Sequence, residues 1–163
     1  MMNFNWQGVM PALTTQFDAQ EQLNLEAFEL NLVAQIEAGV HGIVLGGTLG
    51  EASTLTASEK VLLLKKAQDV ISGRIPVIIN IAEQSTGNAI TAAQAAEANG
   101  ADGLMLLPPM RYKATDEETV QYFAVIAQST KLPIMIYNNP VDYKIEVTLD
   151  MFDELQQYKN IQA

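Results

Sequence analysis

Several residue types are absent or scarce in this sequence, and each absence excludes a kind of site. There is no cysteine, which excludes disulfides, zinc–thiolate centres and thiol nucleophiles. The single histidine, His41, excludes a metal site built from several histidines of this chain. His41 stands just before an apolar run, so we expect it at the N-terminal end of a strand, in a structural role. We therefore predict neither a metal nor a cofactor.

Positive charge and long apolar runs are also scarce. Nine lysines and arginines stand against 19 acidic residues, and the net charge is −10. A chain this acidic, without a basic cluster, is not expected to bind nucleic acid or an anionic membrane surface. No apolar run approaches the ~18 residues that span a bilayer, and the first six residues lack the pattern of a signal peptide. The cytoplasm is therefore the expected location.

What the sequence does contain is an alternation of short apolar runs and helical patterns. Hydrophobic residues make up 48% of the 163 residues, enough for one domain with a sizeable core. The expected strands are Gly8–Thr15, Gly42–Leu45, Pro76–Asn80, Gly103–Leu107 and Ile134–Tyr137, and Asn160–Ala163 resembles the start of a sixth. The expected helices are 25–38, 57–71, 85–99, 116–129 and 148–157, with Thr56 as one capping residue and Thr115 or Asp116 as another. Uninterrupted apolar strands are typical of a parallel sheet that is buried on both faces.

Part of this alternation is an internal repeat. The sequence around Gly42 recurs around Gly103, 61 residues later, and that around Pro76 recurs around Pro133, 57 residues later. Each interval is about the length of two βα units, which favours a (β/α)8 TIM barrel. Such a barrel needs about 250 residues, so we predict that residues 1–163 are the N-terminal portion of a single TIM-barrel domain, with five βα units and the start of strand six. The alternative is a complete doubly wound domain, which lacks a GxGxxG or P-loop after its first strand.

The candidate site follows from the barrel, because barrel sites lie at the C-terminal ends of the strands. The loop Gly46–Glu51 is rich in glycine, and its free amides together with the Thr48 hydroxyl can bind an anion such as a carboxylate. Tyr137 ends an aliphatic strand, and its phenol can relay a proton. Asn80 and Glu83 are further polar residues of this edge. The alternatives are a plain βα turn and a tyrosine that only packs the barrel mouth.

Three motifs together resemble the dihydrodipicolinate synthase / N-acetylneuraminate lyase superfamily. They are Gly47–Glu51, Tyr137–Pro140 and Asn160–Ala163, and the resemblance covers essentially the whole chain. It implies a (β/α)8 barrel, commonly a homotetramer, that forms a lysine Schiff base with pyruvate or a related 2-oxo acid. The protonated imine acts as an electron sink, so the carbanion next to it is stabilised.

The resemblance also implies roles for individual residues. The loop positions Gly47, Thr48 and Leu49 would bind the substrate, with Thr48 and the amides around it holding the carboxylate. Tyr137 would be the phenol beside the lysine. The family's lysine follows the pattern Asn160–Ala163 by a few residues, and no lysine of this chain stands at that position. As printed, the chain is not expected to form the imine.

Three departures argue against dihydrodipicolinate synthase itself. Leu49 replaces the second hydroxyl of the family's threonine pair, Met110 falls where a tyrosine is usual, and Asp142 replaces the arginine that binds the second substrate. Arg111 and Tyr112 offer a substitute cation and phenol. The expected activity is therefore that of an aldolase, dehydratase or synthase acting on a 2-oxo acid. The alternative is a non-catalytic, small-acid-binding or truncated half-barrel without activity.

Overall fold

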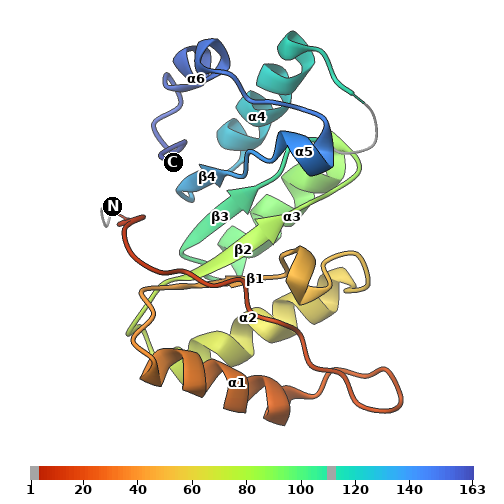
Figure 1. The fold of residues 1–163 in the computed structure, drawn as a ribbon, viewed down its shortest axis with the longest axis vertical. Coiled ribbons are helices and arrows are strands. Elements are labelled where there is room, and N and C mark those ends of the chain that lie inside the picture. Colours follow the sequence, from red (N-terminus) through yellow and green to blue (C-terminus); the bar gives the residue numbers. More distant parts are fainter. Residues whose placement is uncertain (1–3, 110–112) are drawn as a thin grey trace.

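A computed structural model describes residues 4–109 and 113–163, which form a parallel sheet with helices along it (Figure 1). The sheet has four strands in the order β1-β2-β3-β4, and every neighbouring pair is parallel. Its strands are β1 (Ile43–Leu45), β2 (Val77–Ile81), β3 (Gly103–Leu106) and β4 (Ile134–Ile136). A doubly wound sheet reverses its strand order at a switch point. The uninterrupted order seen here is that of a barrel.

The helices α1 to α4 follow one another in chain order up Figure 1, with α6 beside α4 at the top and the short α5 nearer the middle. They are α1 (Leu25–Glu37), α2 (Ala57–Ile71), α3 (Thr86–Ala98), α4 (Asp116–Ser129), α5 (Pro140–Tyr143) and α6 (Leu149–Leu155). Right-handed crossovers to successive strands place the connecting helices on the same face of the sheet. Neighbouring helices accordingly pack in pairs, α1 on α2, α3 on α4 and α4 on α6. The five predicted helices are confirmed within one or two residues at their ends, and α5 was not predicted.

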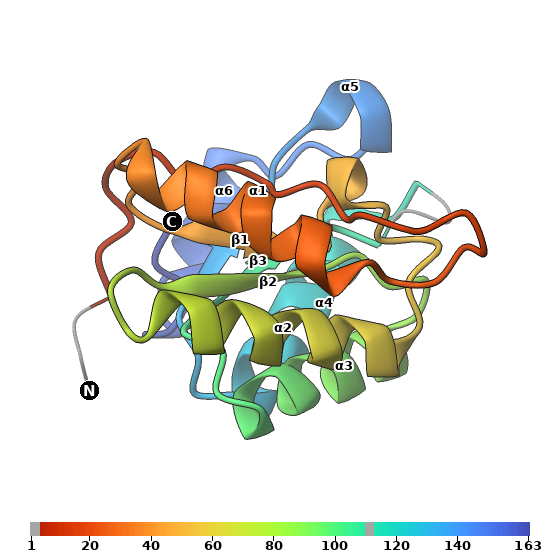
Figure 2. The same cartoon turned by 90° about the horizontal axis from the view of Figure 1, so that it is seen from below.

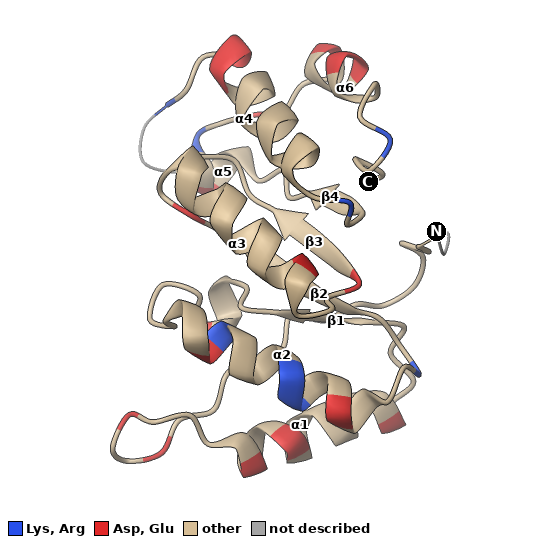
Figure 3. Ribbon diagram, turned by 180° about the vertical axis from the view of Figure 1, so that it is seen from behind, with Lys and Arg blue, Asp and Glu red and all other residues tan. Residues whose placement is uncertain are grey.

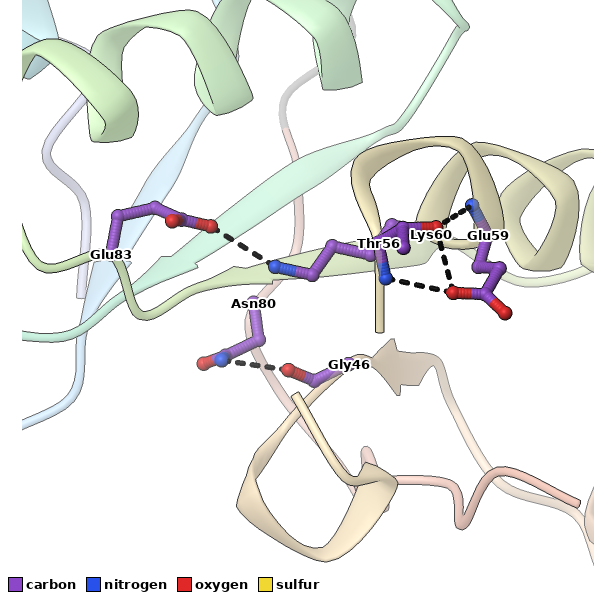
Figure 4. A network of polar contacts seen from close by, with 6 residues as sticks. All are labelled: Gly46, Thr56, Glu59, Lys60, Asn80 and Glu83. Atoms are coloured by element: carbon purple, nitrogen blue, oxygen red, sulfur yellow. Dashed lines mark hydrogen bonds and ion pairs between the residues drawn. The ribbon is translucent and has the colours of Figure 1, made fainter. Parts of the chain in front are cut away.

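Side-chain caps explain where the helices begin. At α2 the Thr56 N–H donates to Glu59 Oε2 at 2.8 Å, and the Glu59 N–H donates to Thr56 Oγ1 at 3.3 Å. The Thr56 hydroxyl also donates to Glu59 Oε2, at 2.7 Å (Figure 4). This bond, and after it the bond from the Thr56 N–H, lowers the pKa of the Glu59 carboxyl. The same reciprocal pair, Thr115 with Glu118, begins α4. The cap of α4 is therefore Thr115, the first of the two predicted alternatives.

The predicted first strand, Gly8–Thr15, was too long. It forms one parallel bridge, Ala12 to Val44, with the Val44 N–H donating to the Pro11 carbonyl and the Leu13 N–H donating to the Val44 carbonyl, both at 2.9 Å. Proline has no N–H to extend the ladder. Within the described residues, the segment therefore pairs with β1 through the two hydrogen bonds of a single bridge.

The opposite edge of the sheet bears out the expected start of a sixth strand. Ile161 forms a parallel bridge with Ile134. The Gln162 N–H donates to the Ile134 carbonyl at 2.9 Å, and the Ile136 N–H donates to the Ala163 carbonyl at 2.7 Å. Bridged segments thus lie on both sides of the four-stranded sheet.

The repeat has a structural basis at the N-terminal ends of the strands. The Val9 N–H donates to His41 Nδ1 at 3.1 Å, and the His41 N–H donates to the Val9 carbonyl at 2.7 Å. Asp102 stands at the equivalent repeat position and exchanges the same two bonds with Val77, each at 2.9 Å. Gly8 allows this approach, since a Cβ there would lie 2.4 Å from the His41 ring. His41 therefore has the structural role expected of it.

The core lies between the sheet and the helices. Alternate strand residues such as Ile43, Ile79 and Leu104 are buried in it. Alanines 89, 93 and 96 of α3 are buried as well, and their small side chains let α3 lie close to β2. The strand residues between them, including Asn80 and Met105, point to the other face, which is the interior of the barrel. This alternation leaves the C-terminal ends of the strands free for the site.

Candidate active site

The predicted site residues gather at the C-terminal edge of the sheet. Thr48 follows β1, Asn80 lies near the end of β2, and Tyr137 follows β4. The short helix α5 lies above this edge, beside the turn that precedes α2 (Figure 2). It brings Tyr143 to the site.

The loop after β1 is shaped by two glycines. Gly46 adopts φ +65°, and the chain then forms the 3₁₀ turn η1 (Thr48–Gly50). A Cβ on Gly50 would lie 2.8 Å from the Leu13 carbonyl oxygen, so the backbone approaches too closely for any side chain. The Thr15 hydroxyl donates to the Gly50 carbonyl at 2.7 Å and is buried there. These contacts fix the turn against the segment before α1.

The turn presents donors to the solvent side. Gly47 is buried, and its carbonyl accepts the N–H groups of Gly50 and Ala52 at 2.9 and 3.2 Å. Thr48 and Leu49 are exposed, and none of the described residues accepts a hydrogen bond from their N–H groups. The Leu49 side chain is 72% exposed, so this position offers a backbone donor and no second hydroxyl. Two N–H groups and the Thr48 hydroxyl can together receive a carboxylate.

Asn80 ties the same loop to β2. Its Nδ2 donates to the Gly46 carbonyl at 2.8 Å, and the residue is only 2% exposed (Figure 4). Its Oδ1 has no hydrogen-bond partner among the described residues. The bond from Nδ2 satisfies the Gly46 carbonyl, which would otherwise lack this hydrogen bond. Asn80 therefore positions the anion-binding turn.

Tyr143 joins the two halves of the site, and the sequence analysis missed it. Its hydroxyl lies 3.3 Å from Thr48 Oγ1, within hydrogen-bonding distance. Its ring packs edge-on against the ring of Tyr137, with centroids 6.0 Å apart and an interplanar angle of 63°. The signal was present in Asn139–Pro140, because asparagine at the N-cap and proline at the first position typically begin a helix.

Two asparagines hold the loop after β4. Asn138 exchanges two hydrogen bonds with the backbone of Val147, at 2.9 and 3.0 Å. Asn139 caps α5, and its Nδ2 donates to Asp142 Oδ2 at 2.8 Å and to the Tyr137 hydroxyl at 3.5 Å. The Asp142 carboxylate is thus linked through one amide to the Tyr137 phenol. Asp142 gives this loop a negative charge, in keeping with its identification in the sequence as a departure from the family's arginine.

The structure places Glu83 away from this cluster and does not describe Arg111. Arg111, with Met110 and Tyr112, falls outside the described residues, so its predicted substrate contact stays a prediction. Glu83 pairs with Lys60 at 3.0 Å, at a cavity of about 320 Å³ between α2 and α3 (Figure 4). In residues 4–109 and 113–163, no three side chains of metal-ligating type come together.

Acidic side chains outnumber basic ones and lie on several helices. Figure 3 shows acidic positions on α1, α4 and α6, with basic positions dispersed over α2 and the C-terminal part of the chain. The described residues form no basic stripe of the kind that follows a phosphate backbone. No helix of the described chain is long and apolar enough to cross a bilayer.

The chain consists of consecutive parallel βα units, and polar groups lie at the C-terminal edge of their sheet. This arrangement defines a segment of a (β/α) barrel, the fold class in which enzyme active sites lie at that edge. The chain belongs to the dihydrodipicolinate synthetase family, whose family model matches residues 5–163. A curated 4-hydroxy-tetrahydrodipicolinate synthase from Exiguobacterium sibiricum is 36% identical over 158 residues, which are 97% of this chain and 54% of that protein. The chain thus spans about half the length of the curated relatives it matches.

Solved structures agree with this assignment. A dihydrodipicolinate synthase of Bacillus anthracis superposes with a TM-score of 0.92 at 32% identity, covering 96% of this chain and 54% of that one. A prophage protein of the same family from Escherichia coli K12, named YagE and solved in complex with pyruvate, gives a TM-score of 0.89 at 30% identity over 96% of this chain and 52% of its own. The predicted barrel family is therefore confirmed.

Proposed function

We propose that this chain carries the carboxylate-binding and proton-transfer residues of a Schiff-base lyase that acts on pyruvate or a related 2-oxo acid. The observation that carries the proposal is the connection from Thr48 through Tyr143 to Tyr137, which sets an anion-binding turn beside a phenol. The pyruvate bound to the YagE relative supports the choice of ligand.

Each group has a role in this proposal. The substrate carboxylate accepts hydrogen bonds from the Thr48 hydroxyl and from the N–H groups that follow Gly47, including that of Leu49. Tyr137 transfers protons while the imine forms and breaks. Arg111 supplies a cation to the far end of the substrate. The nucleophilic lysine lies beyond Ala163, on strand six. It forms the imine that stabilises the neighbouring carbanion.

Asp142 suggests which second substrate the site rejects. A carboxylate at the mouth disfavours a second anionic group, because like charges repel and both must be desolvated. We therefore propose an aldolase, dehydratase or related lyase whose second substrate is uncharged or hydroxylated, such as a 2-oxo sugar acid held by its one carboxylate. We further propose a cytoplasmic homotetramer, and neither metal nor cofactor.

Borohydride trapping with pyruvate tests the mechanism. The chain of 163 residues should show no trapped adduct by mass spectrometry, whereas a chain extended through strand six should gain one on the added lysine. An adduct on Lys113 or Lys144 would show that the nucleophile is misplaced. If the extended chain binds pyruvate without forming an adduct, the site is a non-catalytic binder of small acids, and the lyase proposal is wrong.

A further inference from the structure

Tyr143 contacts both halves of the proposed site, and each contact uses a different part of its side chain. The hydroxyl lies 3.3 Å from Thr48 Oγ1, and the ring packs edge-on against Tyr137. The residue ends α5, whose N-cap is Asn139, and the next residue, Lys144, has left-handed φ of +58°. The chain therefore turns sharply just after the phenol, which fixes where it lies.

The hydroxyl contact can decide how Thr48 uses its single proton. A threonine hydroxyl has one hydrogen to donate and two lone pairs that accept. When Tyr143 donates to Thr48 Oγ1, the Thr48 hydrogen is free to point at a bound carboxylate. In the reverse orientation the Thr48 hydroxyl donates its hydrogen to Tyr143. Only a lone pair of Thr48 Oγ1 then faces the anion, and it repels the anion. A bound anion therefore selects the first orientation.

The ring contact acts on the second half of the site. Tyr137 is 37% exposed, so the surrounding core does not fix its ring by itself. An edge-on aromatic neighbour restricts the ring, because such pairs prefer this geometry. Removing only the Tyr143 hydroxyl leaves this restriction in place, whereas removing the ring abolishes it.

We propose that Tyr143 is a positioning residue that orients the Thr48 hydroxyl toward the substrate carboxylate and holds the Tyr137 ring beside the reacting carbon. This inference rests on the proposed lyase function. It assigns the two effects to separable parts of one side chain. The hydroxyl governs affinity for the 2-oxo acid, and the ring governs the rate of proton transfer.

The test compares Tyr143→Phe with Tyr143→Leu in the protein that carries the proposed lysine, with pyruvate as the substrate. KM and kcat are measured for the exchange of the pyruvate methyl protons with deuterium from the solvent, which passes through the imine and its neighbouring carbanion. Tyr143→Phe should raise the KM for pyruvate by roughly 5-fold, the loss expected for one hydrogen bond, and change kcat less than about 2-fold. Tyr143→Leu should also lower kcat by at least roughly 10-fold, the lower range of a misplaced general acid–base group. In a Thr48→Ala background, Tyr143→Phe should have no further effect on KM.

Tyr158→Phe is the matched control, since its hydroxyl accepts only a bond from Gln128 Nε2 at 3.4 Å among the described residues, away from the site. It should leave KM and kcat unchanged. The inference is overturned if Tyr143→Phe leaves KM unchanged, or if it acts equally with and without Thr48. Failure of the lyase proposal is seen separately, as absence of a trapped adduct in the parent protein. Broadening of the pyruvate methyl NMR signal then still reports whether Tyr143→Phe weakens binding.

Discussion

Single atoms decide the shape of the anion-binding turn, and Gly50 shows this most directly. A Cβ at this position would lie 2.8 Å from the Leu13 carbonyl oxygen, which belongs to backbone that cannot rotate away. We expect Gly50→Ala to lower the free energy of unfolding by about 1–3 kcal/mol, as overpacking does. The same shift should move Thr48, so pyruvate affinity should fall as well. Urea unfolding and pyruvate titration measure the two effects.

Gly87→Ala is the matched control for that substitution. Gly87 lies in the first turn of α3, and a Cβ there would meet nothing within 4 Å. Alanine favours a helix over glycine by up to about 1 kcal/mol, so this variant should be neutral or slightly more stable. A Gly50→Ala protein as stable as the parent would mean that the turn tolerates a side chain and is not held as described.

At the scale of residues, the sequence indicated those candidate site residues that belong to a motif or directly follow a strand. Thr48 and Tyr137 could be found because each follows an apolar run at the edge where barrel sites lie. Tyr143 could not be found this way, since its position depends on how α5 turns back over the sheet. The hydrogen bond from Asn80 to Gly46 could not be predicted either, because it depends on the distance between two strands.

At the scale of elements, a titratable carboxylate on α3, that of Glu97, connects this helix to the segment before β4. The Thr130 hydroxyl donates to Glu97 Oε2 at 2.6 Å, and the Lys131 N–H donates to the same oxygen at 3.0 Å. These bonds, with the Lys131 charge a smaller contribution, lower the pKa of the Glu97 carboxyl. A carboxyl whose pKa is lower in the folded protein stabilises it above the unfolded pKa, and loses this effect as the pH falls through the folded value.

We therefore expect Glu97→Gln to be less stable than the parent by about 1 kcal/mol near neutral pH, because the amide oxygen can still accept both bonds but without the charge that strengthens them. The difference should begin to fall near about pH 4, where the unfolded carboxyl takes up its proton. It should disappear once the pH is below the lowered pKa of the folded carboxyl. Denaturant unfolding over a series of pH values measures it. Glu154→Gln removes the same charge from an exposed position of α6 and should show a small difference at every pH. A difference in unfolding free energy between Glu97→Gln and the parent that stays constant across the pH series would contradict this role of the Glu97 carboxylate.

Helices could be predicted at this scale because caps and periodicity are local. Thr56 with Glu59 is a complete capping box within four residues. The predicted length of the first strand was wrong, because the apolar composition near Pro11 does not indicate how many hydrogen bonds this segment can form with β1. Helix α5 escaped prediction because four residues show no periodicity, and only Asn139–Pro140 indicated it.

For the whole molecule, the repeat carried the most information. His41 and Asp102 stand at equivalent positions of different βα units, and each exchanges two hydrogen bonds with the backbone of another segment. A recurrent unit predicts a barrel because each copy must lie beside the next in the same orientation. A barrel of this kind needs about 250 residues, and the match to the Exiguobacterium sibiricum relative covers 54% of that protein. That residues 1–163 are the N-terminal portion of one barrel domain stays a prediction.

In the 163-residue chain, one bridged segment lies at each edge of the four-stranded sheet. The face of the sheet that lies opposite the helices is only partly covered. Within the described residues no further strand pairs with Ala12 or Ile161, and Met105 and Met135 on the inner face are only partly buried. Unpaired strand edges readily pair with other chains. Prepared by itself, the chain should associate as its concentration rises, as seen by sedimentation velocity. The exposed Leu149 on α6 supplies the control, because Leu149→Ser should leave the association unchanged if the sheet edges cause it. Dissociation of the Leu149→Ser variant, or a monomer at every concentration, would show that the edges are not the interacting surface.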